Sequence, residues 1–370
     1  MTARERVLAS LEHRQPDRIP VYFGGTSSFL TDAQYYRLKE HLNIKGDVMP
    51  YRKGHTGTIY DPRILDALDV DVRFLVYRLE DHGIREVIDE DHMIDEWGIL
   101  LVRSGNMWSR MSAPLKDADV GEIREYQFPD PGSDTWNEDL EQEAKNLREQ
   151  TEYALVARSV HSASFMELGC WLRGSEDFLC ELVMEEESCH VLLDKIMETQ
   201  MKYYEVFLKK VGRYVDIVET SEDFGTQQSL FLSPQTYRDM IMPRRQKINA
   251  VIHKYAPQAK ILHHSCGAVR KLIPDLIETG IDILNPIQPN LPGMDARELK
   301  EEFGDKICFC GGIDMQHAIN GSHQDIDREV IRCKEQLGYG GGYFYSTSNH
   351  IQEDTPIENV MRLFEDFQRL

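Results

Sequence analysis

The sequence predicts an α/β fold, a (β/α)8 (TIM) barrel, from three observations. Short runs of β-forming residues recur along the chain and alternate with amphipathic stretches of helical length, and the eight runs match the number of parallel strands that closes such a barrel. The 370 residues suit one barrel with insertions, so we expect a single domain over 1–370. No G-x-G-x-x-G follows any run, which removes the usual support for an open doubly wound sheet.

The expected strands are runs rich in apolar, β-branched and aromatic residues, and turn or loop residues separate one run from the next. In chain order they are 19–23 (IPVYF), 70–76 (VDVRFLV), 154–159 (ALVARS), 215–219 (VDIVE), 260–264 (KILHH), 281–285 (IDILN), 307–311 (ICFCG) and 342–346 (GYFYS). The clearest helical stretches between them are 176–209, 234–255, 295–303 and 324–337.

Two segments fall outside this alternation. Residues 1–15 have helical spacing and stop at Pro16, so we expect a helix that caps the N-terminal end of the barrel. Residues 78–150 hold an alternating segment and then a proline-rich one. We expect an insertion between the second and third barrel strands, with a β-hairpin near 85–103 and an irregular connection to about 135.

Composition excludes some classes of partner. The formal net charge of −21 argues against nucleic acid and against an anionic membrane surface, and is explained by solubility or, alternatively, by a basic protein partner. No apolar stretch is long enough for a transmembrane helix, and the first residues have no signal-peptide core, so we expect a cytoplasmic protein. Seven scattered cysteines favour core thiols, metal ligands or redox thiols over a disulfide framework.

Candidate site residues are the polar residues and glycines at the strand ends, because these positions meet at one rim of a barrel. In strand order they are Gly24, Gly25 and Thr26; His161 and Ser162; Glu222 and Asp223; His264 and Cys266; Asn285, Gln288 and Asn290; Cys310 and Asp314; and Ser346, Asn349 and His350.

The strongest local signal is ILHHSCG, in which His264 and Cys266 are two residues apart at a strand end and can point to the same side. Imidazole and thiolate together suit zinc. His263 points the other way and is expected to pack against a helix. A third ligand has to come from a neighbouring rim position: Glu222, Asp223, Cys310, Asn349 or His350.

The other chemical groups each have a structural alternative. The paired acids Glu222 and Asp223 are candidates for acid/base catalysis, metal ligation or cation binding, or they cap the next helix. Asp314 is either a site residue or a helix cap. Cys308 and Cys310 face the same side of their strand and are read first as small buried residues.

Several motifs together resemble the uroporphyrinogen decarboxylase-like superfamily. They are PDRIPV, YVDIVETSEDFGTQ, SPQTYRDMIMPRRQKI, HHSCG, GIDILNPIQ, CGGID and DTPIENV, and the resemblance extends over about residues 3–368. It implies a (β/α)8 barrel and one of two activities. One branch decarboxylates uroporphyrinogen without a cofactor, and the other comprises zinc-dependent methyltransferases that exchange methyl groups with a corrinoid protein.

The decarboxylase branch is expected to carry an arginine-rich loop after the first strand and an aspartate after the second. Here the first loop reads VYFGGTSSFLTDAQYY, with no arginine before Arg37, and Tyr77 and Arg78 occupy the place of the aspartate. Because a tetrapyrrole with eight carboxylates needs several cationic contacts, these departures argue against decarboxylase activity.

The methyltransferase branch resembles this chain at His264 and Cys266, but Asn349 stands where its third ligand, a cysteine, is expected. We expect zinc held by His264, Cys266 and Glu222; Glu222 is preferred because the fourth and fifth strands are neighbours, with His350 and Cys310 as alternatives. Glu222 and Asp223 are the expected catalytic acids. The expected substrate-binding residues are Gly25, His161, Asn285, Gln288, Asp314, Asn349 and His350.

The resemblance thus implies a zinc-dependent methyltransferase that moves a methyl group from a small, methoxylated substrate to a corrinoid protein, or from methyl-corrinoid to a thiol. The corrinoid is expected on a separate protein, since the chain has no D-x-H-x-x-G segment. A homodimer is compatible with this assignment. The alternatives are a porphyrinogen decarboxylase and a non-catalytic barrel that binds a small molecule.

Overall fold

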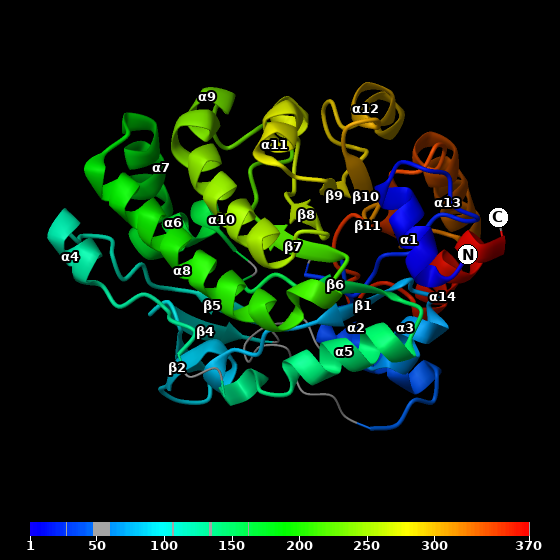
Figure 1. The fold of residues 1–370 in the computed structure, drawn as a ribbon, viewed down its shortest axis with the longest axis horizontal. Helices are drawn as coiled ribbons and strands as arrows, with labels where there is room; N and C mark the ends of the chain where they lie inside the picture. Colours follow the sequence, from blue (N-terminus) through cyan, green and yellow to red (C-terminus); the bar gives the residue numbers. More distant parts are fainter. Residues whose placement is uncertain (27, 47–59, 106, 133–134, 162, 370) are drawn as a thin grey trace.

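A computed structural model of the chain describes residues 1–26, 28–46, 60–105, 107–132, 135–161 and 163–369. Its centre is a curled parallel sheet surrounded by helices (Figure 1). The sheet order follows the sequence: β1 (Val72–Leu75), β6 (Ala154–Ala157), β7 (Ile217–Ser221), β8 (Lys260–His264), β9 (Ile283–Ile287), β10 (Cys308–Ile313) and β11 (Tyr343–Thr347).

The segment predicted as the first strand closes this sheet into a barrel. Val21 forms a parallel bridge with Tyr345 of β11, and Tyr22 N and Pro20 O each bond to the backbone of Tyr345 at 2.9 Å. On its other side, Asp71 N donates to Val21 O at 3.0 Å, directly before β1. The segment therefore lies between the two edge strands. The expected α/β barrel is confirmed, but among the described residues the first of the eight predicted strands is a bridge beside a seven-stranded sheet.

The helices alternate with the strands as expected. They are α1 (Ala3–Leu11), α2 (Asp32–His41), α3 (Pro62–Ala67), α4 (Val120–Glu125), α5 (Leu140–Gln150), α6 (Phe165–Arg173), α7 (Ser175–Met184), α8 (Glu187–Val211), α9 (Pro234–Thr236), α10 (Met242–Tyr255), α11 (Ile273–Thr279), α12 (Ala296–Phe303), α13 (His323–Leu337) and α14 (Ile357–Arg369). Short 3-10 or π turns are η1 (Glu80–Gly83), η2 (Thr135–Asn137), η3 (Gly212–Tyr214), η4 (Tyr237–Ile241) and η5 (Arg270–Leu272).

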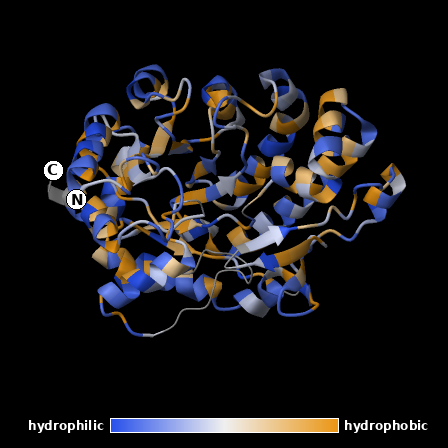
Figure 2. Ribbon diagram, turned by 180° about the vertical axis from the view of Figure 1, so that it is seen from behind, coloured by the Kyte–Doolittle hydropathy of each residue, from blue (hydrophilic) through white to orange (hydrophobic). Residues whose placement is uncertain are grey.

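Most helices around the sheet carry both hydrophobic and hydrophilic residues, as amphipathic helices do (Figure 2). The strands they cover are buried on both faces; every residue of β6, β7, β9, β10 and β11 is buried. Within the described ranges, no helix has the length and apolar composition needed to cross a bilayer.

Two predicted helices are each divided in the structure. The stretch 176–209 is α7 and α8, separated because Glu185 adopts a left-handed conformation with φ of 56°. The stretch 234–255 is α9, the π turn η4 and α10, and Pro243 lies in the first turn of α10. The hydrophobic period continues across both breaks, so the pattern alone did not reveal them.

The chain between β1 and β6 forms a second, antiparallel sheet beside the barrel. Its strands, in spatial order, are β2 (Ile84–Val87), β3 (His92–Asp95), β4 (Leu100–Ser104) and β5 (Met107–Arg110). The β-hairpin expected near 85–103 is therefore only part of this sheet, because strand pairing continues to Arg110. The connection expected to be irregular also contains α4 and η2. The sheet lies on the side away from the chain termini (Figure 1).

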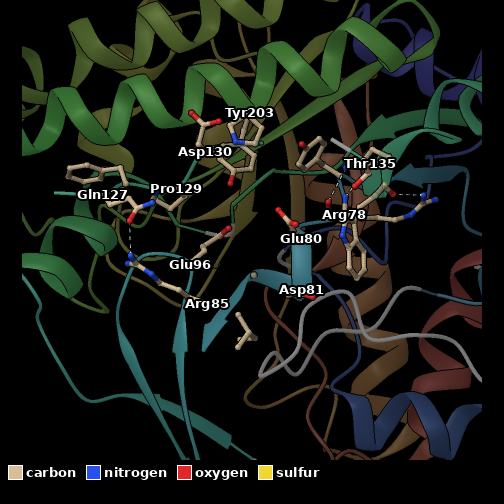
Figure 3. Close-up of a pocket in the computed structure, with 17 residues that line it drawn as sticks. Arg78, Glu80, Asp81, Arg85, Glu96, Gln127, Pro129, Asp130, Thr135 and Tyr203 are labelled. Atoms are coloured by element: carbon tan, nitrogen blue, oxygen red, sulfur yellow. Dashed lines mark hydrogen bonds between the residues drawn. The ribbon is translucent and has the colours of Figure 1, made fainter. Parts of the chain in front are cut away.

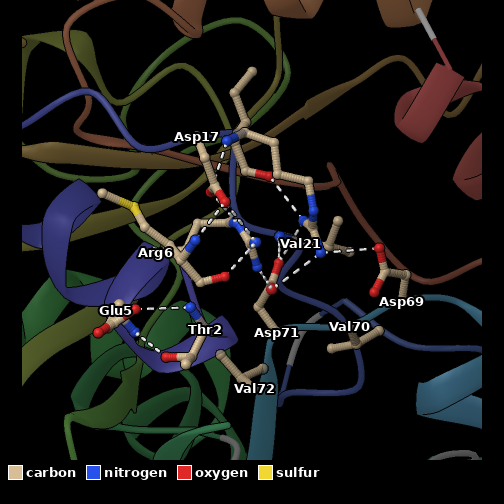
Figure 4. Close-up of polar contacts among 12 residues, drawn as sticks. Thr2, Glu5, Arg6, Asp17, Val21, Asp69, Val70, Asp71 and Val72 are labelled. Carbon is tan, nitrogen blue, oxygen red and sulfur yellow. Dashed lines mark hydrogen bonds and ion pairs between the residues drawn. The ribbon is translucent and has the colours of Figure 1, made fainter. Parts of the chain in front are cut away.

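A buried ionic network lies where the N-terminal segment meets the start of β1 (Figure 4). Arg6 on α1 contacts Asp71 Oδ1 at 2.6 Å, and Arg18 contacts Asp71 Oδ2 at 2.7 Å. Asp71 is 1% exposed and also accepts a bond from Val21 N at 2.7 Å, and Asp17 gives Arg6 a second partner at 2.7 Å. One carboxylate thereby ties α1, the first strand segment and β1 together.

Candidate functional site

Three side chains, from the last residue of β8 and from the loops after β7 and β8, converge at the C-terminal rim of the barrel. Cys266 Sγ lies 3.3 Å from His264 Nε2, and Asp223 Oδ1 lies 3.4 Å from the same nitrogen. One donor atom from each residue lies within 4.8 Å of the other two. Within the described ranges this is the group of histidine, cysteine and acidic residues with the spacing of metal ligands.

Strand register explains why these residues meet. β7 and β8 are parallel neighbours with Ser221 opposite His264, so the chains leave both strands at the same height. The two loops then approach closely at Gly225 and Gly267. A Cβ on Gly267 would lie 2.3 Å from the Gly225 carbonyl carbon, and φ of Gly267 is +96°, so both contact and conformation require glycine there.

Neighbouring strands hold this group in position. His264 Nδ1 lies 2.8 Å from Asn285 Oδ1 in the middle of β9, so an N–H on Nδ1 donates to the amide and leaves the Nε2 lone pair facing Cys266 and Asp223. Gln288 Oε1 accepts from Gly267 N at 2.6 Å, next to Cys266. Asp223 Oδ1 also accepts from Cys266 N at 2.7 Å. The donor atoms are thus fixed before any ligand arrives.

Charge in the group favours a bound cation. Burial alone would lower the pKa of His264, yet Cys266 and Asp223 together hold that pKa well above its usual value. Burial alone would raise the pKa of Asp223, but His264 and the Cys266 N–H lower it. Cys266 and Asp223 thus favour a positive charge at the imidazole between them. A metal ion bound by the three residues would supply that charge in place of the proton.

The third ligand expected from the sequence was Glu222, and its position corrects that expectation. Its carboxylate accepts from Met166 N at 2.7 Å and pairs with Arg245 of α10 at 2.9 Å, with both side chains almost completely buried. The carboxylate therefore points between the barrel and its helices. Asp223, the next residue, supplies the acidic group beside His264, because adjacent residues leaving a strand point to different sides.

Glu167 on α6 was not expected near the site. Burial, together with the Asp223 and Glu222 carboxylates, raises its pKa to about 8. Glu167 therefore holds a proton at neutral pH and adds no third negative charge beside them. It lies within FMELG in an apolar helix, and no feature of the sequence indicated its proximity to the strand ends.

Asn349, expected among the substrate-binding residues, lies beside the group, with its Nδ2 3.8 Å from Cys266 Sγ. His350 stacks on Phe29 with ring centroids 3.6 Å apart, because Ile351 N bonds to Phe29 O and joins the loops after the first and last strands. Burial, with His264 and Arg158 nearby, lowers the pKa of His350 to about 3, so its ring is neutral.

Gly25 takes part in a different cluster, inside the barrel. A Cβ on Gly25 would lie 2.2 Å from Glu219 Oε1, and the buried Glu219 carboxylate accepts from the Tyr22 hydroxyl at 2.6 Å and from Thr26 N at 3.1 Å. Arg158 donates to Gly25 O at 2.9 Å. The sequence did contain a signal for Glu219, which is a charged residue inside an otherwise uncharged strand, IVETS.

Within the described residues, His161 and Asp314 are not among the side chains that have metal-ligand spacing. His161 is buried against Tyr203 and Trp97, with its Nε2 3.3 Å from Glu96, so it contacts the insertion. Asp314 accepts from Gln316 N at 2.8 Å in the turn after β10; the helix cap expected as its alternative is absent, since the next helix, α13, is capped by Ser322. Ser162 lies outside the described residues.

Three further expectations concern packing. His263 lies on the helix side of β8, as predicted, with its Nδ1 2.8 Å from the Thr220 hydroxyl. Cys308 and Cys310 are both buried, and burial raises the pKa of each to about 12, so they are small core residues.

Comparison with known proteins gives a family match over most of the chain. Residues 146–370, more than half of the chain, match the family described as uroporphyrinogen decarboxylase (URO-D).

A curated relative, uroporphyrinogen decarboxylase of Synechocystis sp., is 22% identical over 176 residues, which are 48% of this chain and 46% of the relative. The match thus spans about half the length of that relative.

Among solved structures, a B12-independent methionine synthase from Shewanella sp., in complex with selenomethionine, has a TM-score of 0.45 at 11% identity over 95% of this chain and 96% of that one. Xylanase 10B from Thermotoga maritima has a TM-score of 0.39 at 9% identity, over 62% and 78%. Both scores are too low to carry an argument. On the family match, the chain belongs to the uroporphyrinogen decarboxylase family.

Proposed function

We propose that this protein is a zinc-dependent methyltransferase whose metal is held by Asp223, His264 and Cys266. The observation that carries the proposal is the convergence of one carboxylate, one imidazole and one thiol at the C-terminal rim, where barrel enzymes hold their active sites. Family membership supports an enzyme, and the resemblance of the H-x-C motif to the methyltransferase branch supports the metal.

The spacing of the donor atoms fits tetrahedral zinc. With Zn–N and Zn–O bonds of about 2.0–2.1 Å and a Zn–S bond of about 2.3 Å, the edges of a tetrahedron measure about 3.4 Å between N and O and about 3.6 Å between N and S. The corresponding separations here are 3.4 Å and 3.3 Å. Three protein ligands also leave one coordination position for a substrate, as in catalytic rather than structural zinc sites.

When bound, zinc supplies Lewis-acid activation of the oxygen, nitrogen or sulfur atom that carries or receives the methyl group. The protein's own residues orient the metal ligands and enclose the site. Asn285 fixes the His264 ring, Gln288 fixes the backbone after Cys266, and the neutral His350 ring with Phe29 forms an apolar wall. Glu167, whose raised pKa keeps it protonated at neutral pH, lies beside Asp223 without adding a negative charge to the site.

The second reactant in this proposal is a corrinoid carried by a separate protein, since the chain has no D-x-H-x-x-G segment for holding one. The small reactant is a methylated compound, with a methoxylated one as first choice, or a thiol in the opposite direction. Asp223 as third ligand, in place of a second thiolate, leaves the metal a stronger Lewis acid and so favours an oxygen leaving group.

Methyl transfer to a corrinoid tests the proposal. Zinc-loaded protein is mixed with reduced cobalamin and a panel of methoxylated aromatic compounds, and methylcobalamin is followed by its absorbance; the reverse reaction uses methylcobalamin and thiols. We expect turnover that requires zinc and is lost in Cys266→Ser. Absence of transfer in both directions with a broad panel, from protein that does bind zinc, would contradict the methyltransferase assignment.

A second candidate function is decarboxylation of a porphyrinogen. The name of the Synechocystis relative favours it, and so does buried Arg158, a cation at the barrel end that could face a substrate carboxylate. Against it stand the first-strand loop without an arginine and Arg78, whose guanidinium is paired with Asp139 and with Glu143 at 2.8 Å. Conversion of uroporphyrinogen to coproporphyrinogen at an enzyme-like rate by metal-free protein would establish this candidate instead.

A further inference from the structure

A pocket of about 340 Å³ lies where the insertion and its connection meet the barrel (Figure 3). This volume is in the range of small-molecule sites. Its walls come from residues 77–78 after β1, from η1 and β2, from the turn before β4, from residues 127–131 and 135–137, and from α8. Neither Asp223, His264 nor Cys266 lines it, so it is a site separate from the proposed metal group.

The pocket lining carries carboxylates that lack a lysine or arginine partner. Glu80 forms no hydrogen bond or ion pair with any described residue, and Glu96 has only the imidazole of His161, at 3.3 Å from its Oε1. Figure 3 shows the Glu80 and Glu96 carboxylates turned toward the same space. Two like charges facing one space repel each other, and a cation placed between them removes the repulsion.

The other charged groups of the lining do not neutralise these two. Arg78 is paired with carboxylates outside the lining, Asp139 and Glu143. Lys202 neutralises Asp130 at 2.9 Å. Arg85 donates to the neutral Gln127 amide at 2.9 Å, at the edge of the pocket. The lining carries the four carboxylates of Glu80, Asp81, Glu96 and Asp130 against the two guanidinium groups of Arg78 and Arg85, so its net charge stays negative.

Aromatic rings make up much of the remaining wall: Tyr77, Phe128, Trp136 and Tyr203. Tyr77 and Tyr203 pack edge to face with centroids 5.6 Å apart, which fixes both rings, whereas Trp136 is 37% exposed. Aromatic faces beside carboxylates attract ammonium groups, because the ring quadrupole and the carboxylate charge act in the same direction.

We propose that this pocket binds a small organic cation, an amine or quaternary ammonium compound, between Glu80, Glu96 and the aromatic wall. A metal ion is a poorer occupant, because it needs several converging oxygen ligands. No described acidic groups in this pocket meet the spacing of a metal-ligand group, which in the described chain only Asp223, His264 and Cys266 meet. The inference does not depend on the function proposed for those three residues.

Isothermal titration calorimetry of the full chain with choline tests this proposal. The control ligand is 3,3-dimethyl-1-butanol, which has the same shape without the charge. We expect saturable binding of choline and none of the alcohol. Glu80→Gln and Glu96→Gln should each weaken choline binding, Glu96→Gln by about tenfold and Glu80→Gln by less, because Glu96 is partly buried whereas Glu80 is exposed and its charge is screened by water.

The matched control is Glu86→Gln, which removes the same charge from an exposed residue of β2 outside the pocket lining. Its affinity for choline should equal that of the wild type, and zinc content should be unchanged in all three variants. Absence of saturable binding, equal binding of the alcohol, or equal weakening by Glu86→Gln would each overturn the proposal. Equal weakening by Glu86→Gln would mean that choline is attracted only to the overall negative charge of the protein.

Discussion

His264 Nδ1 and Asn285 Oδ1 lie 2.8 Å apart across the neighbouring strands β8 and β9, in which these two residues are directly opposite. The contact determines which ring nitrogen of His264 remains available, and it directs Nε2 toward Cys266 and Asp223. Hydrogen bonds of this kind behind a histidine ligand fix its tautomer and ring orientation. The amide of Asn285 is itself held, since its Nδ2 contacts Cys310 Sγ at 3.4 Å.

Replacing Asn285 with alanine should therefore weaken zinc binding about 10- to 100-fold, the usual effect of removing such a partner. Competition with a fluorescent chelator measures the affinity. Cys310→Ala is the control, since it removes the contact on the far side of the amide and leaves the His264 bond in place. Equal zinc affinity in Asn285→Ala and the wild type would show that the contact does not prepare His264 for metal.

Glu222→Gln should reduce stability without removing the metal. The change leaves Arg245, whose side chain is 2% exposed, without its charged partner, and breaking a buried ion pair in this way costs about 3–5 kcal/mol. Urea unfolding measures the loss, and metal analysis of the folded fraction should give the wild-type zinc content. Zinc lost in Glu222→Gln and kept in Asp223→Asn would restore Glu222 as the ligand.

His350 should make stability depend on pH in the mildly acidic range. Its folded pKa of about 3 lies below the unfolded value, so the unfolded chain takes up a proton that the folded protein refuses. The stability is complete above about pH 6.5 and falls as the pH drops toward 3, by up to about 1.4 kcal/mol per pH unit. His264, Arg158 and Asp223 are the charged groups that face this ring.

The variant His350→Phe keeps a ring on Phe29 but cannot take up a proton. We expect the loss of stability between pH 7 and pH 5.5 to be smaller in this variant by about 1 kcal/mol, as measured by urea unfolding at both values. The same pH dependence in both proteins would mean that His350 is protonated in the folded state.

Asp71→Asn should destabilise the barrel by about 3 kcal/mol, at the lower end for a broken buried ion pair because Arg6 retains Asp17. Asp69→Asn is the matched control. Asp69 also pairs with Arg18 but its side chain is 58% exposed, so its loss should cost no more than about 1 kcal/mol. A similar loss of stability in both variants would contradict the role assigned to the network in Figure 4.

The barrel could be predicted from the sequence because several of its strands are mostly apolar runs bounded by turns, as in IPVYF and ICFCG. Period and spacing also placed His264 and Cys266 on one side of the chain and His263 on the other. The extent of the antiparallel sheet was missed, since the residues of β5, MWSR, show no clear alternation and their partners in β4 decide the pairing.

The choice of Glu222 over Asp223 shows a different limit. Both acids follow the same strand, and strand neighbourhood brings both near His264. Which of the two turns to the rim depends on Arg245, a residue of α10 that is 23 positions away and whose orientation no local pattern gives. The contacts of His161 with Trp97 and Tyr203 are likewise tertiary. Through Trp97, His161 packs against the insertion, and no local pattern predicts this position.

Metal analysis of purified protein tests the central claim most directly. Wild-type protein and Cys180→Ser, which removes an exposed thiol on α7, should each bind one zinc ion per chain. Cys266→Ser and Asp223→Asn should each lose most of it while remaining folded by circular dichroism. Full zinc in Cys266→Ser, or none in the wild type after incubation with zinc, would contradict the metal site and the methyltransferase proposed from it.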